Sequence, residues 1–398
     1  YYAELYDLRV VADRRELFVR VLQALGAASL VLAALYYWFP SLIIGRGVFL
    51  IAAIAVVTLV AGWRFAFEWV VGRVGPSERL LVVGTGSAAL TLAAELKERR
   101  KELGVKIVGF VDDEGIRDLG DGEHVIGCVD DIPAIVREHQ IERVVVSLAD
   151  ARGKLPMDKL LDMKLNGVVF DHLASVYEEY TGKIALENLR PSWLIFSEGF
   201  RKSHLVTATK RAADLAVGAI GLIVAAPVMA LVAVAVRLSS PGPALYHQER
   251  VGQHGRTFTV HKFRSMRADA EAATGAVWAQ QNDSRVTPVG AFLRKTRLDE
   301  LPQLWNVLRG DMSLVGPRPE RPEFVRMLTK EIPFYGQRHS VKPGVTGWAQ
   351  VCYTYGASVE DAMEKLQYDL FYIKNLSIGL DVFVLFKTVQ TVVLKRGQ

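Results

Sequence analysis

The sequence predicts a membrane protein of mixed α/β class, in which transmembrane helices precede a parallel α/β domain and an α-rich domain that returns to the membrane. Three observations predict this class. Of the 398 residues, 51% are hydrophobic, which is high for a soluble protein. Three charge-free apolar stretches are long enough to cross or enter a bilayer. After the second stretch, strand and helix patterns alternate, as is typical of a parallel sheet covered by helices.

The first two apolar stretches predict transmembrane helices. Residues 21–38 and 47–63 contain no charged side chain, and Arg46 is the one cation in the turn between them. Several arginines lie before the pair and after it, so the positive-inside rule places both outer ends in the cytoplasm. We assign residues 1–76 to these helices; a helical hairpin buried in a protein core is the alternative.

The third apolar stretch, residues 215–236, predicts a re-entrant helix. Cations flank it on both sides, with Arg211 before it and Arg237 after it, so both flanks favour the cytoplasm. Pro227 lies in the middle, where a proline removes one helical hydrogen bond and clashes with the carbonyl four residues earlier. We expect a helix at about 211–237 that breaks at Pro227 and leaves the membrane by the face it entered, in preference to a full span.

Residues 77–190 predict a Rossmann-like nucleotide-binding-type domain. A strand pattern at 79–83 precedes a glycine turn, Gly84-Thr85-Gly86, which opens a helix to about residue 100. A second strand, 106–111, ends at Asp112, where dinucleotide-binding folds place the acidic residue for a ribose hydroxyl. Further elements continue the alternation, with strands at 124–128 and 143–147 and a helix at 132–139.

The sequence leaves open whether this domain binds a nucleotide. A glycine turn alone is equally typical of a scaffold that has no ligand. Tyr177, Tyr180 and Lys183 do not have the Tyr-x-x-x-Lys spacing of short-chain reductases. We interpret the domain as regulatory or structural. The alternative is a membrane-anchored, NAD-dependent nucleotide-sugar oxidoreductase or epimerase that uses the Gly84 turn.

Two adjacent carboxylates, Asp299 and Glu300, lie among cations in the last third of the chain. Asp299 could act as a nucleophile or a metal ligand, and Glu300 as a ligand. Arg294, Arg297 and Arg318 carry planar guanidinium groups that suit phosphate oxygens. This set predicts a site for a phosphate ester and a metal ion. The alternative is the start of a helix, because acidic residues followed by a proline stabilise a first helical turn.

Short strands and two final helices surround this pair in the sequence. The strands are predicted at 245–252 and 257–266 around a glycine turn, and the helices at 359–376 and 377–394. Lys262 and Arg264 lie on the second strand. They either place cations near the carboxylates or form a solvated edge.

Five motifs follow one another in the same region, at residues 262–266, 298–308, 310–313, 316–320 and 342–348. Together they resemble the bacterial sugar transferases, the monotopic polyprenol phosphate phosphoglycosyl transferases, with residues 191–398 as the catalytic domain. The upstream part is similar to larger members, such as undecaprenyl-phosphate glucose or galactose phosphotransferases, which add transmembrane helices and a Rossmann-like domain. Those members commonly have four amino-terminal helices, so we expect more sequence before Tyr1.

The resemblance implies a reaction that starts exopolysaccharide, capsule or O-antigen assembly. A cytosolic UDP-sugar gives its sugar-1-phosphate to undecaprenyl phosphate, and UMP is released. Asp299 matches the family's nucleophile, which forms a covalent phosphosugar intermediate, and Glu300 matches the residue associated with Mg²⁺. The candidate catalytic residues are Asp299, Glu300, Arg294, Lys262 and Arg264, and the candidate substrate-binding residues are Arg318, Pro317, Pro319 and Arg297.

The resemblance also implies a location and partners. The catalytic domain is expected on the cytoplasmic face of the bacterial inner membrane, with UDP-sugar and undecaprenyl phosphate as substrates and a homodimer as the assembly. The net charge of +5 is modest, and no nucleic-acid-binding motif is present. Cys128 and Cys352 are too few for a disulfide framework or a four-cysteine metal site.

Overall fold

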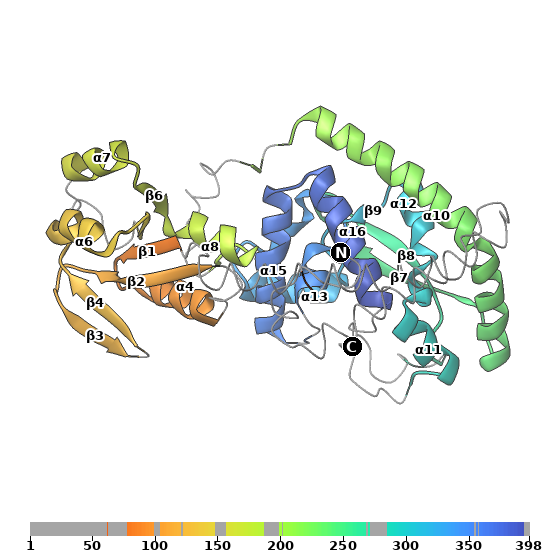
Figure 1. Cartoon of the computed structure of the whole chain (residues 1–398). Coiled ribbons are helices and arrows are strands. Elements are labelled where there is room, and N and C mark those ends of the chain that lie inside the picture. Colours follow the sequence, from red (N-terminus) through yellow and green to blue (C-terminus); the bar gives the residue numbers. More distant parts are fainter. Residues whose placement is uncertain are drawn as a thin grey trace. The chain divides into compact units, whose positions relative to one another are not determined.

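The computed structural model describes residues 62, 78–98, 104–120, 122–147, 157–186, 199–200, 202–267, 270, 285–353, 356 and 358–393. The predicted transmembrane helices lie outside the described residues, apart from Gly62. Internal contacts divide the chain into two compact units, Tyr1–Val176 and Tyr177–Gln398. They are called the amino-terminal and carboxy-terminal units below, and each is described by itself (Figure 1).

The amino-terminal unit contains a six-stranded sheet of order β3-β4-β2-β1-β5-β6. All neighbouring strands are parallel except β3, which pairs antiparallel with β4. The predicted alternation of strands and helices is confirmed, and β3 was not predicted. The strands are β1 (Glu78–Val83), β2 (Val105–Val111), β3 (Arg117–Gly120), β4 (Glu123–Gly127), β5 (Arg143–Val146) and β6 (Val169–His172). The helices are α4 (Ser87–Glu98), α6 (Ile132–His139), α7 (Met157–Leu165) and α8 (Leu173–Thr181), the last of which runs into the carboxy-terminal unit.

Strand β1 lies at the centre of this sheet because its side chains are apolar on both faces. Leu80, Leu81 and Val82 have no exposed surface, as expected for a strand covered by helices on both sides. The strand ends at Gly84, whose φ of 102° is readily adopted only by glycine. The chain then turns into α4, as the glycine pattern predicted.

The acidic residue at the end of β2 already has partners within this unit. Asp112 accepts hydrogen bonds from Thr85 at 2.6 Å and from Arg117 at 2.7 Å, both at Oδ2. Arg117 belongs to the unpredicted strand β3. The position predicted for a ribose contact is therefore occupied by a side-chain cation of the same unit.

The carboxy-terminal unit combines helices with two small sheets. Strands β7 and β8 form an antiparallel hairpin that pairs Leu245 with Phe263 and Val251 with Thr257, as predicted. Strands β9 and β10 form a short parallel pair, which was not predicted. The strands are β7 (Leu245–Val251), β8 (Thr257–Phe263), β9 (Ser313–Val315) and β10 (Gly344–Thr346). The helices are α10 (His204–Ser239), α11 (Pro288–Thr296), α12 (Gln303–Arg309), α13 (Pro322–Glu331), α14 (Trp348–Cys352), α15 (Val359–Lys374) and α16 (Ile378–Val393).

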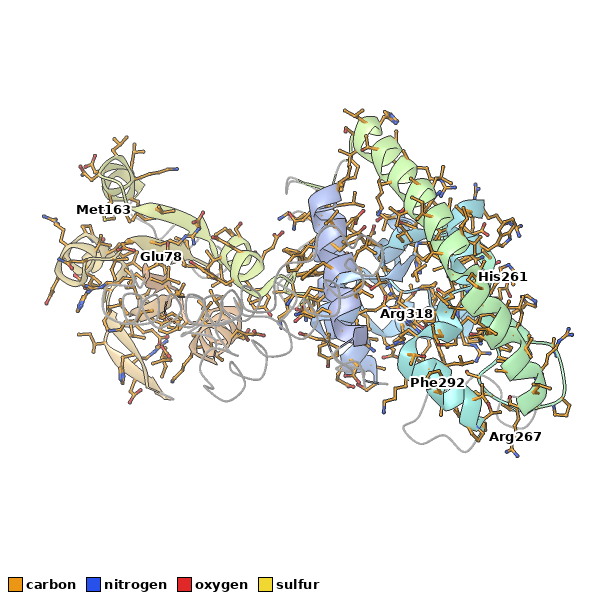
Figure 2. All side chains as sticks on the ribbon, turned by 45° about the vertical axis from the view of Figure 1, so that its right-hand side comes forward. Glu78, Met163, His261, Arg267, Phe292 and Arg318 are labelled. Atoms are coloured by element: carbon orange, nitrogen blue, oxygen red, sulfur yellow. The ribbon has the colours of Figure 1, made fainter. Side chains whose placement is uncertain are left out.

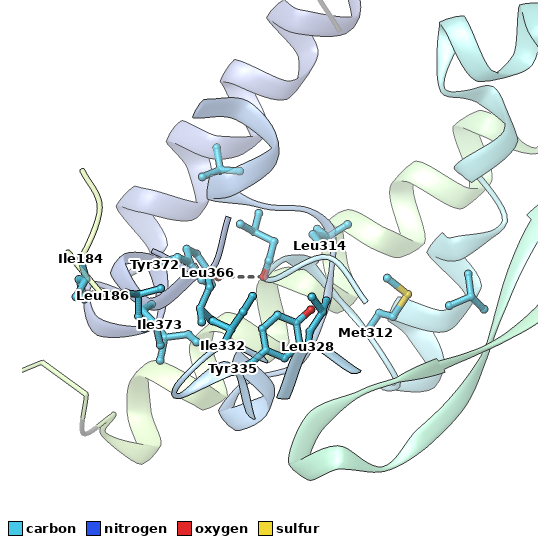
Figure 3. Packing of buried hydrophobic residues seen from close by; sticks show 14 of the residues in the cluster. Ile184, Leu186, Met312, Leu314, Leu328, Ile332, Tyr335, Leu366, Tyr372 and Ile373 are labelled. Carbon is cyan, nitrogen blue, oxygen red and sulfur yellow. Dashed lines mark hydrogen bonds between the residues drawn. The ribbon is translucent and has the colours of Figure 1, made fainter. Parts of the chain in front are cut away.

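The core of this unit lies between α15, α13 and the β9 region (Figure 3). Its centre is formed by Met312, Leu366 and Leu370, each with at most 1% exposure. Tyr372 of α15 is also buried, and its hydroxyl donates to the carbonyl of Val315 at 3.0 Å. The two final helices, α15 and α16, confirm the helical periodicity predicted for the end of the chain.

Helix α10 corrects the prediction of a break at Pro227. It runs from His204 through Pro227 to Ser239 as one helix of 36 residues. Pro227 removes only one backbone N–H, the one that would bond to the carbonyl of Ile223, so the remaining hydrogen bonds continue the helix. The axis of α10 changes direction in its second half (Figure 1), as expected when a proline bends a helix without ending it.

The first turns of α10 are bonded firmly to the rest of the unit. Arg211 donates to the carbonyls of Val307 and Leu308, at 2.7 and 2.9 Å, and so satisfies the end of α12. Asp214 accepts from the backbone N–H of Leu314 at 3.1 Å. By length and composition, α10 could cross a membrane. Its most apolar stretch of 18 residues has a mean hydropathy of 2.7, and 11% of that stretch is buried.

Candidate active site

The predicted carboxylate pair lies in a one-turn 3₁₀ helix, Leu298–Glu300, between α11 and α12. Arg297 ends α11 in the left-handed conformation, with φ 58° and ψ 15°, and this turns the chain into the 3₁₀ helix. The left-handed region is uncommon for a residue with a Cβ. The turn buries both carboxylates, and Asp299 and Glu300 are each 8% exposed. The helix-start alternative is thus also partly true, because the pair lies in a 3₁₀ turn that only Leu301 and Pro302 separate from α12.

Glu300 is an ionised group held between two cations. Its Oε1 accepts from Lys262 Nζ at 3.0 Å and from Arg318 Nη2 at 2.9 Å. Burial by itself raises the pKa of Glu300, but the nearby cations outweigh burial and hold the pKa well below its usual range. Arg318 has the largest lowering effect, followed by Lys262 and Arg297. Figure 2 labels Arg318 among the crowded side chains in the middle of the carboxy-terminal unit.

Asp299 differs from its neighbour because it lacks such a partner. Its Oδ1 is buried and accepts no hydrogen bond from any described residue. Burial and repulsion by Glu300 raise the pKa of Asp299 to about 6. Lys262 and Arg318 act in the opposite direction but do not cancel these effects. Near neutral pH, Asp299 is therefore a mostly ionised carboxylate with an oxygen available for reaction or ligation.

A small pocket, a cavity of about 10 Å³ with a cationic lining, lies beside the pair. It is lined by Arg250, Val260, Lys262, Gln303, Arg318, Pro319 and Gly344. Two of its cations, Lys262 and Arg318, are the partners of Glu300. The third, Arg250, donates to the carbonyl of Pro319 at 3.2 Å and lies 3.5 Å from Glu320. Such a lining favours an anionic ligand.

Close backbone packing fixes the loop that carries Arg318. A Cβ on Gly344 would lie 2.1 Å from the backbone nitrogen of Gly316, and a Cβ on Gly316 would lie 2.4 Å from the carbonyl oxygen of Lys342. Neither glycine therefore tolerates a side chain. The carbonyl of Pro317 accepts from Gly344 N–H at 3.0 Å. On the other side, the carbonyl of Arg318 accepts from Arg338 at 2.9 Å.

A buried ion pair supports the loop that carries Arg318. Arg338 pairs with Asp369 of α15 at 2.8 Å, and it donates to the hydroxyl of Tyr335 at 2.6 Å. Burial raises the pKa of Asp369 to about 6, against the opposing effect of Arg338. Through these bonds, α15 fixes the position of the backbone of Arg318.

Two predicted catalytic residues lie apart from the carboxylates. Arg264 is 6% exposed, and its guanidinium donates to the carbonyls of Ser240 and Pro241, both at 2.8 Å. It thus fastens the segment that follows α10. Arg294 lies in the last turn of α11. Among the described residues, no hydrogen bond or ion pair joins its side chain to Asp299 or Glu300.

The other predicted residues lie at or next to the pocket. Lys262 and Arg318 contact Glu300 directly, and Arg297 contributes its charge to both carboxylates. Pro319 lines the pocket, and Pro317 holds the loop through its carbonyl.

The sequence motifs did not identify Arg250 and Gln303 as pocket residues. The hairpin register contains the signal for Arg250, because Arg250 pairs with Phe258. Side chains two residues apart share one face of a strand, so Arg250 lies on the same face as Val260 and Lys262. Gln303 follows Glu300 by three residues, a spacing that keeps side chains close at a helix start.

The carboxylate oxygens of the pair are of the kind that Mg²⁺ takes as ligands. Mg²⁺ commonly takes one or two carboxylates, with substrate phosphate oxygens and waters as the other ligands. The unpartnered buried oxygen of Asp299 fits this requirement. No group of three or more acidic, histidine or cysteine side chains suited to a metal occurs within the described part of the chain. The residues thus fit a metal ion that is shared with a phosphate ester.

Two family matches cover most of the chain. Residues 205–395 match the family described as bacterial sugar transferase, and residues 2–157 match the family described as CoA-binding domain. The first match contains the carboxylate pair and all residues that line the pocket. The second contains the parallel sheet from β1 to β5.

Curated relatives agree with the first match. The UDP-N-acetylgalactosamine-undecaprenyl-phosphate N-acetylgalactosaminephosphotransferase of Aeromonas hydrophila is 44% identical over 226 residues, which are 57% of this chain and 52% of that protein. The UDP-glucose:undecaprenyl-phosphate glucose-1-phosphate transferase of Xanthomonas campestris pv. campestris is 35% identical over 324 residues, 78% of this chain and 66% of that protein. The chain thus spans between about half and two thirds of these two relatives.

A shorter relative is covered almost completely. The exopolysaccharide production protein PSS of Rhizobium leguminosarum bv. phaseoli is 43% identical over 194 residues, which are 48% of this chain and 96% of that protein. With the match over residues 205–395, this coverage shows that the chain belongs to the bacterial sugar transferase family.

Proposed function

We propose that the protein transfers a sugar-1-phosphate from a UDP-sugar to undecaprenyl phosphate. The products are UMP and an undecaprenyl-diphosphate-linked sugar, the starting unit of exopolysaccharide, capsule or O-antigen assembly. The observation that carries the proposal is the contrast within the pair. Glu300 is neutralised by two cations, whereas Asp299 keeps a buried oxygen that has no partner among the described residues, beside a cation-lined pocket.

The first step forms a covalent bond to Asp299. An oxygen of its carboxylate attacks the phosphorus that bears the sugar, and the bond from that phosphorus to the bridging oxygen breaks. UMP leaves with the bonding electrons, and a phosphosugar remains on Asp299. A carboxylate whose pKa is about 6 is mostly ionised at neutral pH, so it needs no general base for this attack.

The second step regenerates the carboxylate. A phosphate oxygen of undecaprenyl phosphate attacks the same phosphorus, and the bond to Asp299 breaks. One site therefore serves a water-soluble donor and a lipid acceptor in turn. Lys262 and Arg318 offset negative charge at the reacting phosphoryl group, in addition to holding Glu300.

Asp299 and Glu300 would hold a Mg²⁺ ion together with the substrate phosphates. When bound, the ion would reduce the electrostatic repulsion between the anionic nucleophile and the negatively charged diphosphate. We expect Mg²⁺ to raise the melting temperature of the wild-type protein, and to do so less in Asp299→Asn. This measurement does not depend on turnover.

Helix α10 supports a location at the inner membrane, with the site on its cytoplasmic face. Leu205, Ile223 and Leu231, spread along the helix, are each more than 70% exposed, and such surface is stable in lipid rather than in water. The helix continues through Pro227 and its axis changes direction in its second half, so we propose that it enters the membrane and leaves by the same face as a bent helix. We also propose a homodimer, which light scattering of the detergent-solubilised protein tests.

The oxidoreductase alternative is not retained. The relatives named above carry transferase or exopolysaccharide names. In the amino-terminal unit, Asp112 is bonded to Arg117 and Thr85 and has a cation where the alternative requires a ribose.

The test is release of UMP from a panel of UDP-sugars without lipid acceptor. The wild-type protein should release about one UMP per active site, and Asp299→Asn should release none. Glu323→Gln, at an exposed position of α13, is the control for expression and handling. Substantial release by Asp299→Asn would refute the covalent role, and no release by the wild-type protein from any UDP-sugar would refute the function.

A further inference from the structure

We propose that Gln303 is a substrate-binding residue, whose side-chain amide donates a hydrogen bond to a phosphoryl oxygen of the diphosphate substrate. The inference rests on the proposed function and adds to it a contact that the sequence motifs did not identify. It concerns the pocket beside the carboxylate pair, which Gln303 lines together with Arg250 and Lys262.

The first argument is that Gln303 is buried without a hydrogen-bond partner. It is 3% exposed, at the first position of α12, and its Nε2 has no partner among the described residues. A buried amide nitrogen without a partner is unfavourable, and native proteins contain few of them. Because Gln303 lines a small cavity, the missing acceptor can come from a single oxygen of a bound molecule that enters the cavity.

The second argument concerns the chemistry of that acceptor. Arg250, Lys262 and Arg318 line the same pocket, so its ligand is anionic. Glu300 does not supply the acceptor for Gln303 in this arrangement, since Nε2 of Gln303 has no partner among the described residues, Glu300 included. Ionised phosphoryl oxygens only accept hydrogen bonds, and the amide Nε2 of Gln303 only donates them. A phosphoryl oxygen therefore satisfies the charge of the pocket and the unused donor together.

The proposal predicts opposite effects on stability and on binding. Replacing Gln303 with methionine removes an unsatisfied polar group and keeps most of its volume, so the fold should not lose stability. The same change removes a donor to a charged acceptor. Hydrogen bonds of this kind are strong enough to change an affinity by roughly 10- to 100-fold. A residue with a purely structural role would not separate these two effects.

The experiment measures binding of inorganic pyrophosphate to the full chain by calorimetry, thermal unfolding, and UMP release from UDP-sugars. The variants are Gln303→Met and Gln303→Glu, of which the second replaces the donor with a carboxylate that repels phosphate. Gln390→Met is the matched control. Gln390 is 2% exposed, and its Nε2 also lacks a partner among the described residues, but it does not line the pocket.

We expect Gln303→Met to bind pyrophosphate about 10- to 100-fold more weakly than the wild-type protein. Its melting temperature should be equal or higher, and Gln303→Glu should bind more weakly still. Gln390→Met should bind like the wild-type protein. Binding by Gln303→Met within twofold of wild type would overturn the proposal. So would no pyrophosphate binding by the wild-type protein, or a melting temperature of Gln303→Met below that of the wild-type protein. Because pyrophosphate binding needs no turnover, these outcomes decide the role of Gln303 even if no UDP-sugar releases UMP.

Discussion

Replacing Lys262 with methionine should move the pH dependence of UMP release to higher pH. Asp299 must be ionised to attack phosphorus, so the first step should become faster as the pH rises through the pKa of Asp299. Burial and repulsion by Glu300 raise this pKa to about 6, whereas Lys262 lowers it. Methionine has a similar length and no charge, so the variant removes the cation and keeps most of the packing.

The size of the effect follows from the pKa. With a pKa of about 6, Asp299 is about 90% ionised at pH 7 and about 10% ionised at pH 5. A nearby opposite charge typically lowers a carboxyl pKa by about 1 to 3. Arg318 remains in the variant, so we expect a rise of about 1, at the low end of that range. The ionised fraction at pH 7 then falls to about one half, and it is nearly complete at pH 9.

The assay is single-turnover UMP release without lipid acceptor, from pH 5 to pH 9. Lys295→Met is the matched control, because Lys295 is an exposed cation in the last turn of α11. Its midpoint should equal that of the wild-type protein. A midpoint for Lys262→Met that stays near pH 6 or moves down would refute the electrostatic argument. A rate reduced by the same factor at every pH, with the midpoint unchanged, would show that Lys262 acts on the substrate alone.

Three further predictions concern the fold around the site. Asp299→Asn should raise the free energy of unfolding by about 1–2 kcal/mol at pH 7. The pKa of Asp299 is about 6 in the folded protein, above the ordinary 3.8, so the wild-type protein loses stability as the pH rises from 3.8 through 6. The stability advantage of Asp299→Asn over the wild-type protein, measured by denaturant titration, should therefore be smaller at pH 4.5 than at pH 7. Arg264→Met should lower the free energy of unfolding by about 3 kcal/mol, since three hydrogen bonds to Ser240 and Pro241 are lost, while the pH midpoint of UMP release stays unchanged. Gly344→Ala should lower the free energy of unfolding by about 2–3 kcal/mol; Gly336→Ala, where a Cβ meets nothing within 4 Å, is its control, and equal melting temperatures would contradict the close packing.

Local periodicity was sufficient to predict the strands β1, β2, β4 and β5, the hairpin of β7 and β8, and the two final helices. The strands β1 and β2 and the helix α4 follow from an apolar run, a glycine turn and a second apolar run. Strand β3 was not predicted because its four residues, Arg117–Gly120, carry no apolar alternation and pair only with a neighbouring strand. The predicted break at Pro227 was wrong because one missing hydrogen bond bends a helix whose other bonds remain.

The site was predicted in part. The length of β8 explains the wrong expectation for Arg264, and the register of the hairpin explains why Arg250 was missed. Lys262 and Arg264 are two residues apart and would share a face if the strand continued. Strand β8 ends at Phe263, however, so Arg264 leaves that face and bonds to the segment after α10. Arg250 reaches the pocket through the hairpin register, which a motif within one segment does not encode.

The site leaves two buried groups without partners, and this arrangement can be explained by the reaction. The oxygen of Asp299 and the amide nitrogen of Gln303 are both buried and unpartnered within the described part of the chain, although the same turn gives Glu300 two cationic partners. Unpaired buried groups reduce stability, and they persist in proteins where a ligand or a reaction uses them. Asp299 presents a nucleophile, and Gln303 presents a donor. A substrate phosphoryl group between them would be attacked at phosphorus by the Asp299 oxygen and would accept a hydrogen bond from Gln303 at one of its own oxygens. If so, Asp299→Asn and Gln303→Met should each stabilise the free protein, and Gln303→Met should reduce the stabilisation that pyrophosphate gives in thermal unfolding.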